Sequence, residues 1–145
     1  MPSLYVVLAF LVGPGLVVNG IFKHGWDRAR PKALVEFGMK APHGTGDSNL
    51  AGSHGRSFPS GHASTAFYLS CLGCVAARWG TPKGMAVCLP LGLVWGGLVG
   101  WSRIASGAHF LSDMLWSAAL VNLVNFLVLL PFMVGCIPSE ANAED

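Results

Sequence analysis

Four apolar stretches, separated by polar segments, divide this chain. Three of them contain no Asp, Glu, Lys or Arg: Leu4–Phe22, Gly84–Ser102 and Met114–Ser139. A helix rises about 1.5 Å per residue, so each stretch is long enough to cross a hydrocarbon core of about 30 Å. A shorter fourth run lies between His62 and Arg78, and it reaches a spanning length when Ser60–Gly80 forms one helix. The pattern predicts an all-α, integral-membrane bundle of four transmembrane helices.

Composition agrees with this prediction. The 145 residues are 52% hydrophobic and 11% charged, with a mean hydropathy of +0.54, which is typical of the bilayer rather than of a soluble domain. The first run lacks a basic leader and a small-residue cleavage site, so we expect a spanning helix there rather than a signal peptide. The formal net charge is +2 without a block of Lys or Arg, so no nucleic-acid partner is expected. Residues 1–138 are predicted to form one membrane domain, followed by a disordered acidic tail at 139–145.

Small and polar residues within the apolar runs predict how the helices pack. Glycine recurs at every fourth position in the third run, at Gly92, Gly96 and Gly100, which gives one smooth helix face that another helix can approach closely. In the last run Asn122 and Asn125 are expected to face the bundle interior. The cysteines are interpreted as small packing residues because all of them lie in apolar runs: Cys71, Cys74, Cys88 and Cys136.

Because successive spans reverse direction, several polar segments are expected to meet at one membrane face. After the first run, Lys23 and Arg30 stand seven residues apart, about two helical turns, so that two cations can converge on one anion. A juxtamembrane basic cluster with Trp26 as an interface anchor explains the same residues without a ligand. The polar loop Lys32–Ser57 is expected to be a lid or a substrate-contacting loop, and its histidines, like His24, lack metal-ligand spacing.

The second run opens on Pro59-Ser60-Gly61-His62. Ser60 is placed to cap the helix, and Gly61 leaves the free N–H groups of the first turn accessible, an arrangement that attracts anions. His62 would then lie in the first turn, beside a bound anion and able to give or take a proton. The alternative is a capping motif with an incidental histidine.

The third polar segment, Ser102–Asp113, carries a third cation, Arg103, and a histidine and carboxylate four residues apart. If the following helix begins near Ala108, His109 and Asp113 share one face, and the carboxylate can hold one imidazole nitrogen while the other remains free to attack. A pair that only satisfies itself at a helix start is the alternative. Together the three segments match displacement at a phosphate ester, which needs charge neutralisation, a nucleophile and a proton donor.

These segments resemble the three-part signature of the type 2 phosphatidic acid phosphatase family: Lys-x6-Arg-Pro at Lys23–Pro31, Pro-Ser-Gly-His at Pro59–His62, and Ser-Arg-x5-His-x3-Asp at Ser102–Asp113. The resemblance implies a phosphohistidine on His109, with Asp113 orienting it and His62 as acid to the leaving group. It also implies a phosphate held by several residues, and neither a metal nor another cofactor. The phosphate-binding residues would be Lys23, Arg30, Ser60, Gly61 and Arg103.

The sequences that surround two of the motifs, Phe22–Pro31 and Gly107–Trp116, are most similar to those of bacterial lipid A phosphatase-like members. Typical members of the family are six-helix bundles, so we expect this sequence to correspond to their core without the two leading helices, either as a fragment or as a reduced variant. The expected function is hydrolysis of the phosphate monoester or pyrophosphate of a lipid. A vanadium haloperoxidase-like enzyme and a non-catalytic protein that binds or transports phospholipid are the alternatives, and the oligomeric state is left open.

Membrane orientation depends on which signal is followed. Most of the basic residues lie on the face that carries the motifs, whereas Arg78 and Lys83 lie opposite, so the positive-inside rule favours the cytoplasm. Three of the basic residues belong to the motifs themselves, and the resemblance to bacterial lipid phosphatases implies the periplasm. We therefore expect an inner-membrane protein with its site facing the periplasm.

Overall fold

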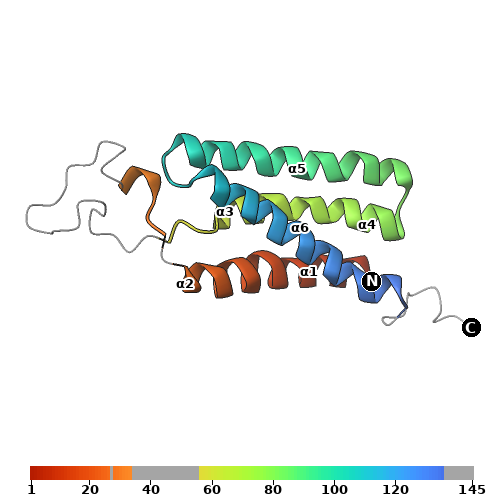
Figure 1. The fold of residues 1–145 in the computed structure, drawn as a ribbon. Coiled ribbons are helices and arrows are strands. Elements are labelled where there is room, and N and C mark those ends of the chain that lie inside the picture. The colour runs from red at the N-terminus through yellow and green to blue at the C-terminus, as the bar shows by residue number, and fades with distance from the viewer. Residues whose placement is uncertain (27, 34–55, 136–145) are drawn as a thin grey trace, which may run out of the picture.

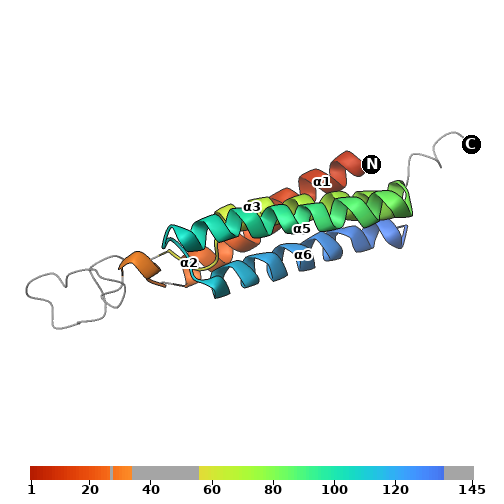
Figure 2. The same cartoon turned by 90° about the horizontal axis from the view of Figure 1, so that it is seen from above.

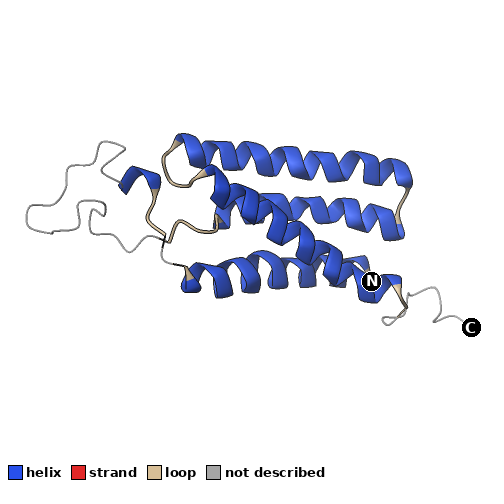
Figure 3. Cartoon of the chain, in the orientation of Figure 1, coloured by secondary structure: helices blue, strands red, loops and turns tan. Residues whose placement is uncertain are grey.

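The computed structural model describes residues 1–26, 28–33 and 56–135. Within these residues every regular element is a helix, as the apolar pattern predicts (Figure 3). The helices form an elongated bundle of rods that lie side by side in both views (Figures 1 and 2). The predicted lid falls mostly on residues 34–55 and the predicted tail on 139–145, and both lie outside the described residues.

The first rod is continuous from Pro2 to Gly25. It consists of α1 (Pro2–Phe10), the π-helical η1 (Leu11–Phe22) and the short α2 (Lys23–Gly25). Pro14 lies inside the π-helical part, which tolerates the missing N–H of a proline. The Asn19 amide donates to the Pro14 carbonyl at 2.6 Å, so the side chain satisfies an acceptor within the apolar rod.

Three further rods complete the bundle. The second consists of α3 (Gly61–Phe67), the 3-10 turn η4 (Tyr68–Ser70) and α4 (Cys71–Trp79), and it is followed by α5 (Pro82–Ala105) and α6 (Leu111–Met133). Thr81 caps α5 by accepting from the Gly84 N–H at 3.0 Å, and Pro82 takes the first helical position. A separate 3-10 turn, η2 (Pro31–Ala33), follows the first rod.

Three helices among the described residues are long and apolar enough to cross a membrane: Pro2–Gly25, Pro82–Ala105 and Leu111–Met133. They correspond to the three uncharged runs, although α6 ends at Met133 rather than Ser139, with Gly135 in a left-handed conformation. The rod from Gly61 to Trp79 is helical but does not belong to these three. Large apolar side chains face outward on the long helices, as lipid-facing residues do, for example Leu91, Trp101 and Leu115 at 62%, 69% and 62% exposure.

The glycine stripe on α5 packs as predicted. The three glycines are buried, and a Cβ on each would collide with a different partner: at Gly92 the Ser70 backbone, at Gly96 the Phe67 ring and at Gly100 the Met114 thioether. The absence of side chains therefore lets α5 approach both the second rod and α6.

The asparagines of α6 face the interior, also as predicted. The Asn122 Oδ1 accepts from the Ser70 hydroxyl at 2.8 Å, and the Asn125 amide donates to the Ser70 oxygen at 3.1 Å. The Tyr5 hydroxyl of α1 donates to the backbone carbonyl of Asn125 at 3.0 Å, so three rods meet at this polar contact. The described cysteines, Cys71, Cys74 and Cys88, are free thiols, as packing residues would be.

The order of the rods brings the three motif segments together. In Figures 1 and 2 the end of α2, the start of α3, the end of α5 and the start of α6 lie at one end of the bundle, and the N-terminus lies at the other. The alternation inferred from the apolar runs is therefore confirmed for the described elements.

Candidate active site

His109 lies in a turn before α6, not on the helix. Gly107 adopts a φ of +64°, and the N–H groups of Ala108 and His109 donate to the Arg103 carbonyl at 3.0 and 3.3 Å. The helix starts at Leu111 because the Asp113 carboxylate accepts from the Phe110 N–H at 2.9 Å, which caps the first turn. The expectation of a helix from Ala108, with histidine and aspartate on one helical face, was therefore wrong.

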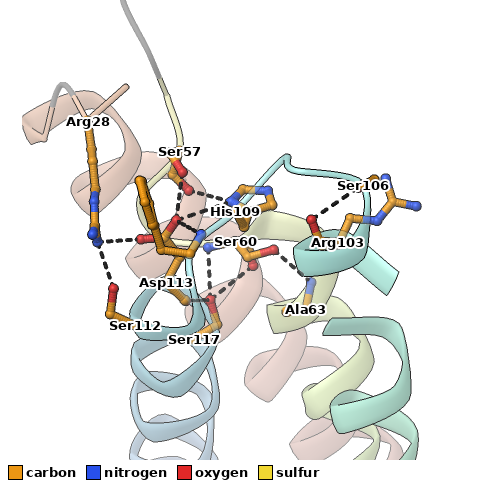
Figure 4. A network of polar contacts seen from close by, with 11 residues as sticks. Arg28, Ser57, Ser60, Ala63, Arg103, Ser106, His109, Ser112, Asp113 and Ser117 are labelled. Carbon is orange, nitrogen blue, oxygen red and sulfur yellow. Dashed lines mark hydrogen bonds and ion pairs between the residues drawn. The ribbon is translucent and has the colours of Figure 1, made fainter. Parts of the chain in front are cut away.

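The His109 imidazole is buried and is held at one nitrogen. Its Nδ1 lies 2.7 Å from the Ser57 carbonyl oxygen and 3.6 Å from Asp113 Oδ2 (Figure 4). A carbonyl oxygen only accepts, so Nδ1 carries the proton in this contact and the lone pair of the neutral ring lies on Nε2. Asp113 is at ion-pair distance, as expected, but Ser57 makes the direct hydrogen bond.

Asp113 is fully buried and surrounded by donors. Its Oδ2 accepts from the Ser57 hydroxyl at 2.6 Å in addition to the Phe110 N–H, and its Oδ1 accepts from Arg28 Nη1 at 2.7 Å (Figure 4). A buried carboxylate is stable as an anion when it has such partners. Arg28 and Ser57 were not identified from the sequence, since neither belongs to a recognised motif position.

The cations predicted to hold phosphate lie near enough to His62 for their charges to act on it. This histidine is exposed at the second residue of α3, and the positive charges of Arg103, Lys23 and Arg30 all act on its imidazole. His109 acts on it as well, so the two histidines and the three cations share one region. Several positive charges in one place produce a potential that attracts a phosphate group.

Gly61 makes room for Lys23. A Cβ at this position would lie 2.9 Å from Asn19 Oδ1 and 3.2 Å from Lys23 Nζ, closer than ordinary contact. The Lys23 ammonium donates to the same Asn19 oxygen at 3.4 Å. The glycine thus lets the first rod bring its lysine against the start of α3.

Ser60 caps α3 as predicted, with its Oγ accepting from the Ala63 N–H at 3.3 Å. It is also fully buried, and its N–H donates to the Ser117 hydroxyl oxygen at 2.9 Å. The Ser117 hydroxyl in turn lies 2.7 Å from the Asp113 carbonyl. Ser60 therefore ties the start of α3 to α6, and only its hydroxyl group is left for a role toward phosphate. Ser117 is a further contact that sequence reasoning missed.

Arg103 retains an unused donor. Its Nε is buried and has no hydrogen-bond partner among the residues that the structure describes. A buried guanidinium donor without an acceptor is unfavourable, so a bound anion would satisfy it. Across residues 1–26, 28–33 and 56–135, no three His, Cys, Asp or Glu side chains gather as metal ligands would.

A groove of about 660 Å³ adjoins this region. Lys23, Gly61 and His62 line one part of it, and the remainder is mostly apolar, with residues from the first rod, the second rod and α5: Phe10, Asn19, Thr65, Ala66, Tyr68, Leu69, Trp95 and Val99. The cationic region thus continues directly into an apolar surface.

The structure has three helices long and apolar enough to cross a membrane and two histidines near several cations, and comparison with known proteins identifies its class. Residues 3–135 match the model of the PAP2 superfamily, so the chain belongs to that superfamily. It is 31% identical to the lipid A 4'-phosphatase of Francisella tularensis subsp. novicida over 125 residues, which are 86% of this chain and 55% of that protein.

The lipid A 4'-phosphatases of two further species are similar. Identity is 37% with the protein of Rhizobium leguminosarum, over 82% of this chain and 51% of the relative. It is 36% with the protein of Rhizobium etli, over 83% of this chain and 47% of the relative. The chain spans about half the length of these curated relatives. No solved structure matches it.

Proposed function

We propose that this protein is a membrane phosphatase that hydrolyses the phosphate monoester or pyrophosphate of a lipid through a phosphohistidine on His109. The observation that carries the proposal is the held imidazole: Nδ1 is engaged by the Ser57 carbonyl, and Nε2 retains its lone pair, in the region where three cations act on His62. Membership of the PAP2 superfamily and the similarity to lipid A 4'-phosphatases support the same chemistry.

The proposed reaction has two displacements at phosphorus. The Nε2 lone pair of His109 forms a bond to phosphorus while the bond to the lipid oxygen breaks, and His62 gives its proton to that oxygen. The positive charge left on the imidazole is stabilised by Asp113 at 3.6 Å from Nδ1. Water then gives a proton to His62 and its oxygen to phosphorus, the N–P bond breaks, and inorganic phosphate leaves.

The phosphate oxygens would be bound by donors from three rods. Lys23 and Arg30 come from the first segment, Ser60 and Gly61 from the start of α3, and Arg103 from the end of α5. The unpartnered Nε of Arg103 supports this assignment, because an anion there would supply its missing acceptor. Cations and helix N–H groups stabilise the charge that spreads over the transferring oxygens.

A lipid substrate suits the surroundings of the site. The apolar groove beside Lys23 and His62 would take a hydrocarbon chain, with its phosphate at the cationic end. We also propose that the rod from Gly61 to Trp79 crosses the membrane as a fourth helix. It joins the site end of the bundle to the start of α5 at the opposite end (Figure 1), and α5 is long and apolar enough to span.

Within the lipids, we propose a lipid A-type phosphorylated glycolipid, in the inner membrane with the site facing the periplasm. The named activity of the three relatives supports this choice. A haloperoxidase would need halide and vanadate for turnover, and a non-catalytic lipid binder would release no phosphate.

The test uses the full chain purified in detergent and in lipid vesicles. Phosphate release is measured from 4'-phosphorylated lipid A, phosphatidate and undecaprenyl pyrophosphate, with and without vanadate, and halide oxidation is measured with vanadate, halide and hydrogen peroxide. We expect release from lipid A, loss of release in His109→Ala, and inhibition by vanadate. Undiminished release by His109→Ala, or halide oxidation in place of hydrolysis, would contradict the proposal.

A further inference from the structure

We propose that Arg28 and Ser57 are positioning residues that together fix the tautomer of His109 and keep Asp113 ionised beside it. Arg28 occupies a variable position of the first motif, Lys23–Pro31, and Ser57 lies outside the motifs. The inference rests on the proposed function, because it concerns the group that would attack phosphorus. Figure 4 shows Arg28 and Ser57 approaching Asp113 from different segments of the chain.

Four contacts join these residues, and three of them close a ring of Arg28, Ser57 and Asp113. The Ser57 N–H donates to the Arg28 carbonyl at 3.0 Å, and the Ser57 carbonyl lies 2.7 Å from His109 Nδ1. The Ser57 hydroxyl donates to Asp113 Oδ2 at 2.6 Å, and Arg28 Nη1 donates to Asp113 Oδ1 at 2.7 Å. The contact between Ser57 and Nδ1 attaches His109 to this ring, so a shift of Ser57 would displace the imidazole as well.

The contact with Ser57 determines which imidazole nitrogen of His109 carries the proton. The Ser57 carbonyl can only accept, so the contact with Nδ1 requires a proton there and leaves Nε2 as the nucleophilic nitrogen. The position of that carbonyl is set by the two other contacts of Ser57, one through its N–H and one through its hydroxyl. Loss of the hydroxyl would remove one of these two anchors.

Arg28 supplies the permanent positive charge that Asp113 faces. The carboxylate has no solvent exposure, and among the residues that the structure describes Arg28 lies on one of its oxygens and His109 near the other. The neutral imidazole cannot balance the carboxylate before phosphorus is attacked, so Arg28 does so. The Arg28 guanidinium also stacks over the Phe110 ring, 4.3 Å from its centroid, which fixes its direction.

This arrangement separates positioning from phosphate binding. Arg28 is directed at Asp113 and Ser112, whereas Lys23, Arg30 and Arg103 act on His62. Removal of the Arg28 charge would leave a buried carboxylate uncompensated, which favours its protonation and removes the anion that stabilises the phosphohistidine cation. The rate of chemistry should fall, while substrate affinity should change little.

The kinetic test compares Arg28→Gln, Arg28→Lys and Ser57→Ala in the full chain, with Lys83→Gln as a control that removes an exposed positive charge at the start of α5, away from the site. We expect kcat to fall about 30-fold in Arg28→Gln with KM within about threefold, and Arg28→Lys to recover most of that loss. Lys83→Gln should stay within about twofold of the wild type. A rise in KM that exceeds the fall in kcat would contradict the proposal, because it would make Arg28 a phosphate ligand.

A spectroscopic test does not depend on activity. The tautomer of His109 is read from the 15N shifts of its imidazole, assigned by comparison with His109→Gln, in wild type and in each variant that remains folded. We expect the wild type to carry its neutral proton on Nδ1 and Arg28→Gln and Ser57→Ala to give a mixture. A wild-type proton on Nε2, or an unchanged pure tautomer in both variants, would overturn the inference. Absence of phosphatase activity in a wild type with the expected tautomer would instead overturn the proposed function.

Discussion

At the scale of single residues, Asp113 has the most demanding role. It is fully buried, and its two oxygens accept from Arg28, Ser57 and the Phe110 N–H. We expect Asp113→Asn to lower turnover at least about 10²-fold, which corresponds to about 2.7 kcal/mol of transition-state stabilisation. An amide carries no charge to balance the imidazolium. Its NH2 group would also replace an accepting oxygen and face one of the groups that now donate to the carboxylate.

Turnover and thermal midpoint should be measured on the same preparation of Asp113→Asn, because the change also weakens a buried ion pair. A folded variant that keeps more than about a tenth of wild-type turnover, a barrier change below about 1.4 kcal/mol, would show that the carboxylate only supports the turn.

His62 is expected to act on the leaving group. It is exposed at the start of α3, where the charges of Arg103, Lys23 and Arg30 act on it. His62→Ala should slow the first-turnover release of the lipid alcohol about 10²-fold or more and the first-turnover release of p-nitrophenol much less, because a good leaving group needs no proton. His24→Ala, a change at another exposed histidine, is the control and should leave both rates near wild type. Equal losses on both substrates in His62→Ala would argue against proton donation.

Individual residues also mark the limit of sequence reasoning. His109, Asp113, His62 and the cations could be named because they stand in recognisable motifs. Arg28 and Ser57 could not, since their contacts with Asp113 join positions 85 and 56 residues apart. The contact of His109 is to a backbone carbonyl, which any residue type at position 57 would provide.

At the scale of helices, neighbouring glycines on α5 give a matched test of packing. A Cβ at Gly96 would collide with the Phe67 ring of α3, whereas Gly97 has nothing within 4 Å. We expect Gly96→Ala to destabilise the fold by about 1–3 kcal/mol and to lower the thermal midpoint, because the ring must move. Gly97→Ala should be neutral or slightly stabilising, since alanine is the better helix former. Similar thermal midpoints for the two variants would contradict the observed packing of α3 against α5.

The helices that were predicted best from the sequence are the three that contain a long uncharged run. Their apolar runs exceed a membrane's thickness, so length alone identifies them. The rod from Gly61 to Trp79 is less apolar and contains a 3-10 turn, and it was therefore the weakest of the four predictions. The start of α6 was misplaced by three residues because the Asp113 side chain, rather than helix propensity, determines where the helix begins.

At the scale of the whole molecule, the bundle collects its polar chemistry at one end. The reversal of successive rods brings together segments that lie far apart in the sequence, and this could be predicted from the apolar pattern alone (Figure 1). The apolar pattern could not predict which side chains contact one another within the site, since those contacts join segments that lie outside the apolar runs.

Metal removal tests whether these side chains suffice for catalysis. His62, His109 and Asp113 are assigned to proton transfer, attack and positioning, and no step requires a Lewis acid. We expect full activity in excess chelator, measured as phosphate release after prolonged dialysis. Loss of activity that a divalent ion restores would show that an essential group has been overlooked.

Trapping the covalent intermediate tests the central claim most directly. The full chain is mixed with a substrate labelled in its phosphate and quenched within the first turnover, and the labelled peptide is identified by mass spectrometry. We predict an alkali-stable, acid-labile phosphate on His109, which accumulates further in His62→Ala with a good leaving group because water is no longer activated. Labelled phosphoenzyme in His109→Ala, or a phosphate on another residue of the wild type, would contradict the assignment of His109 as the nucleophile.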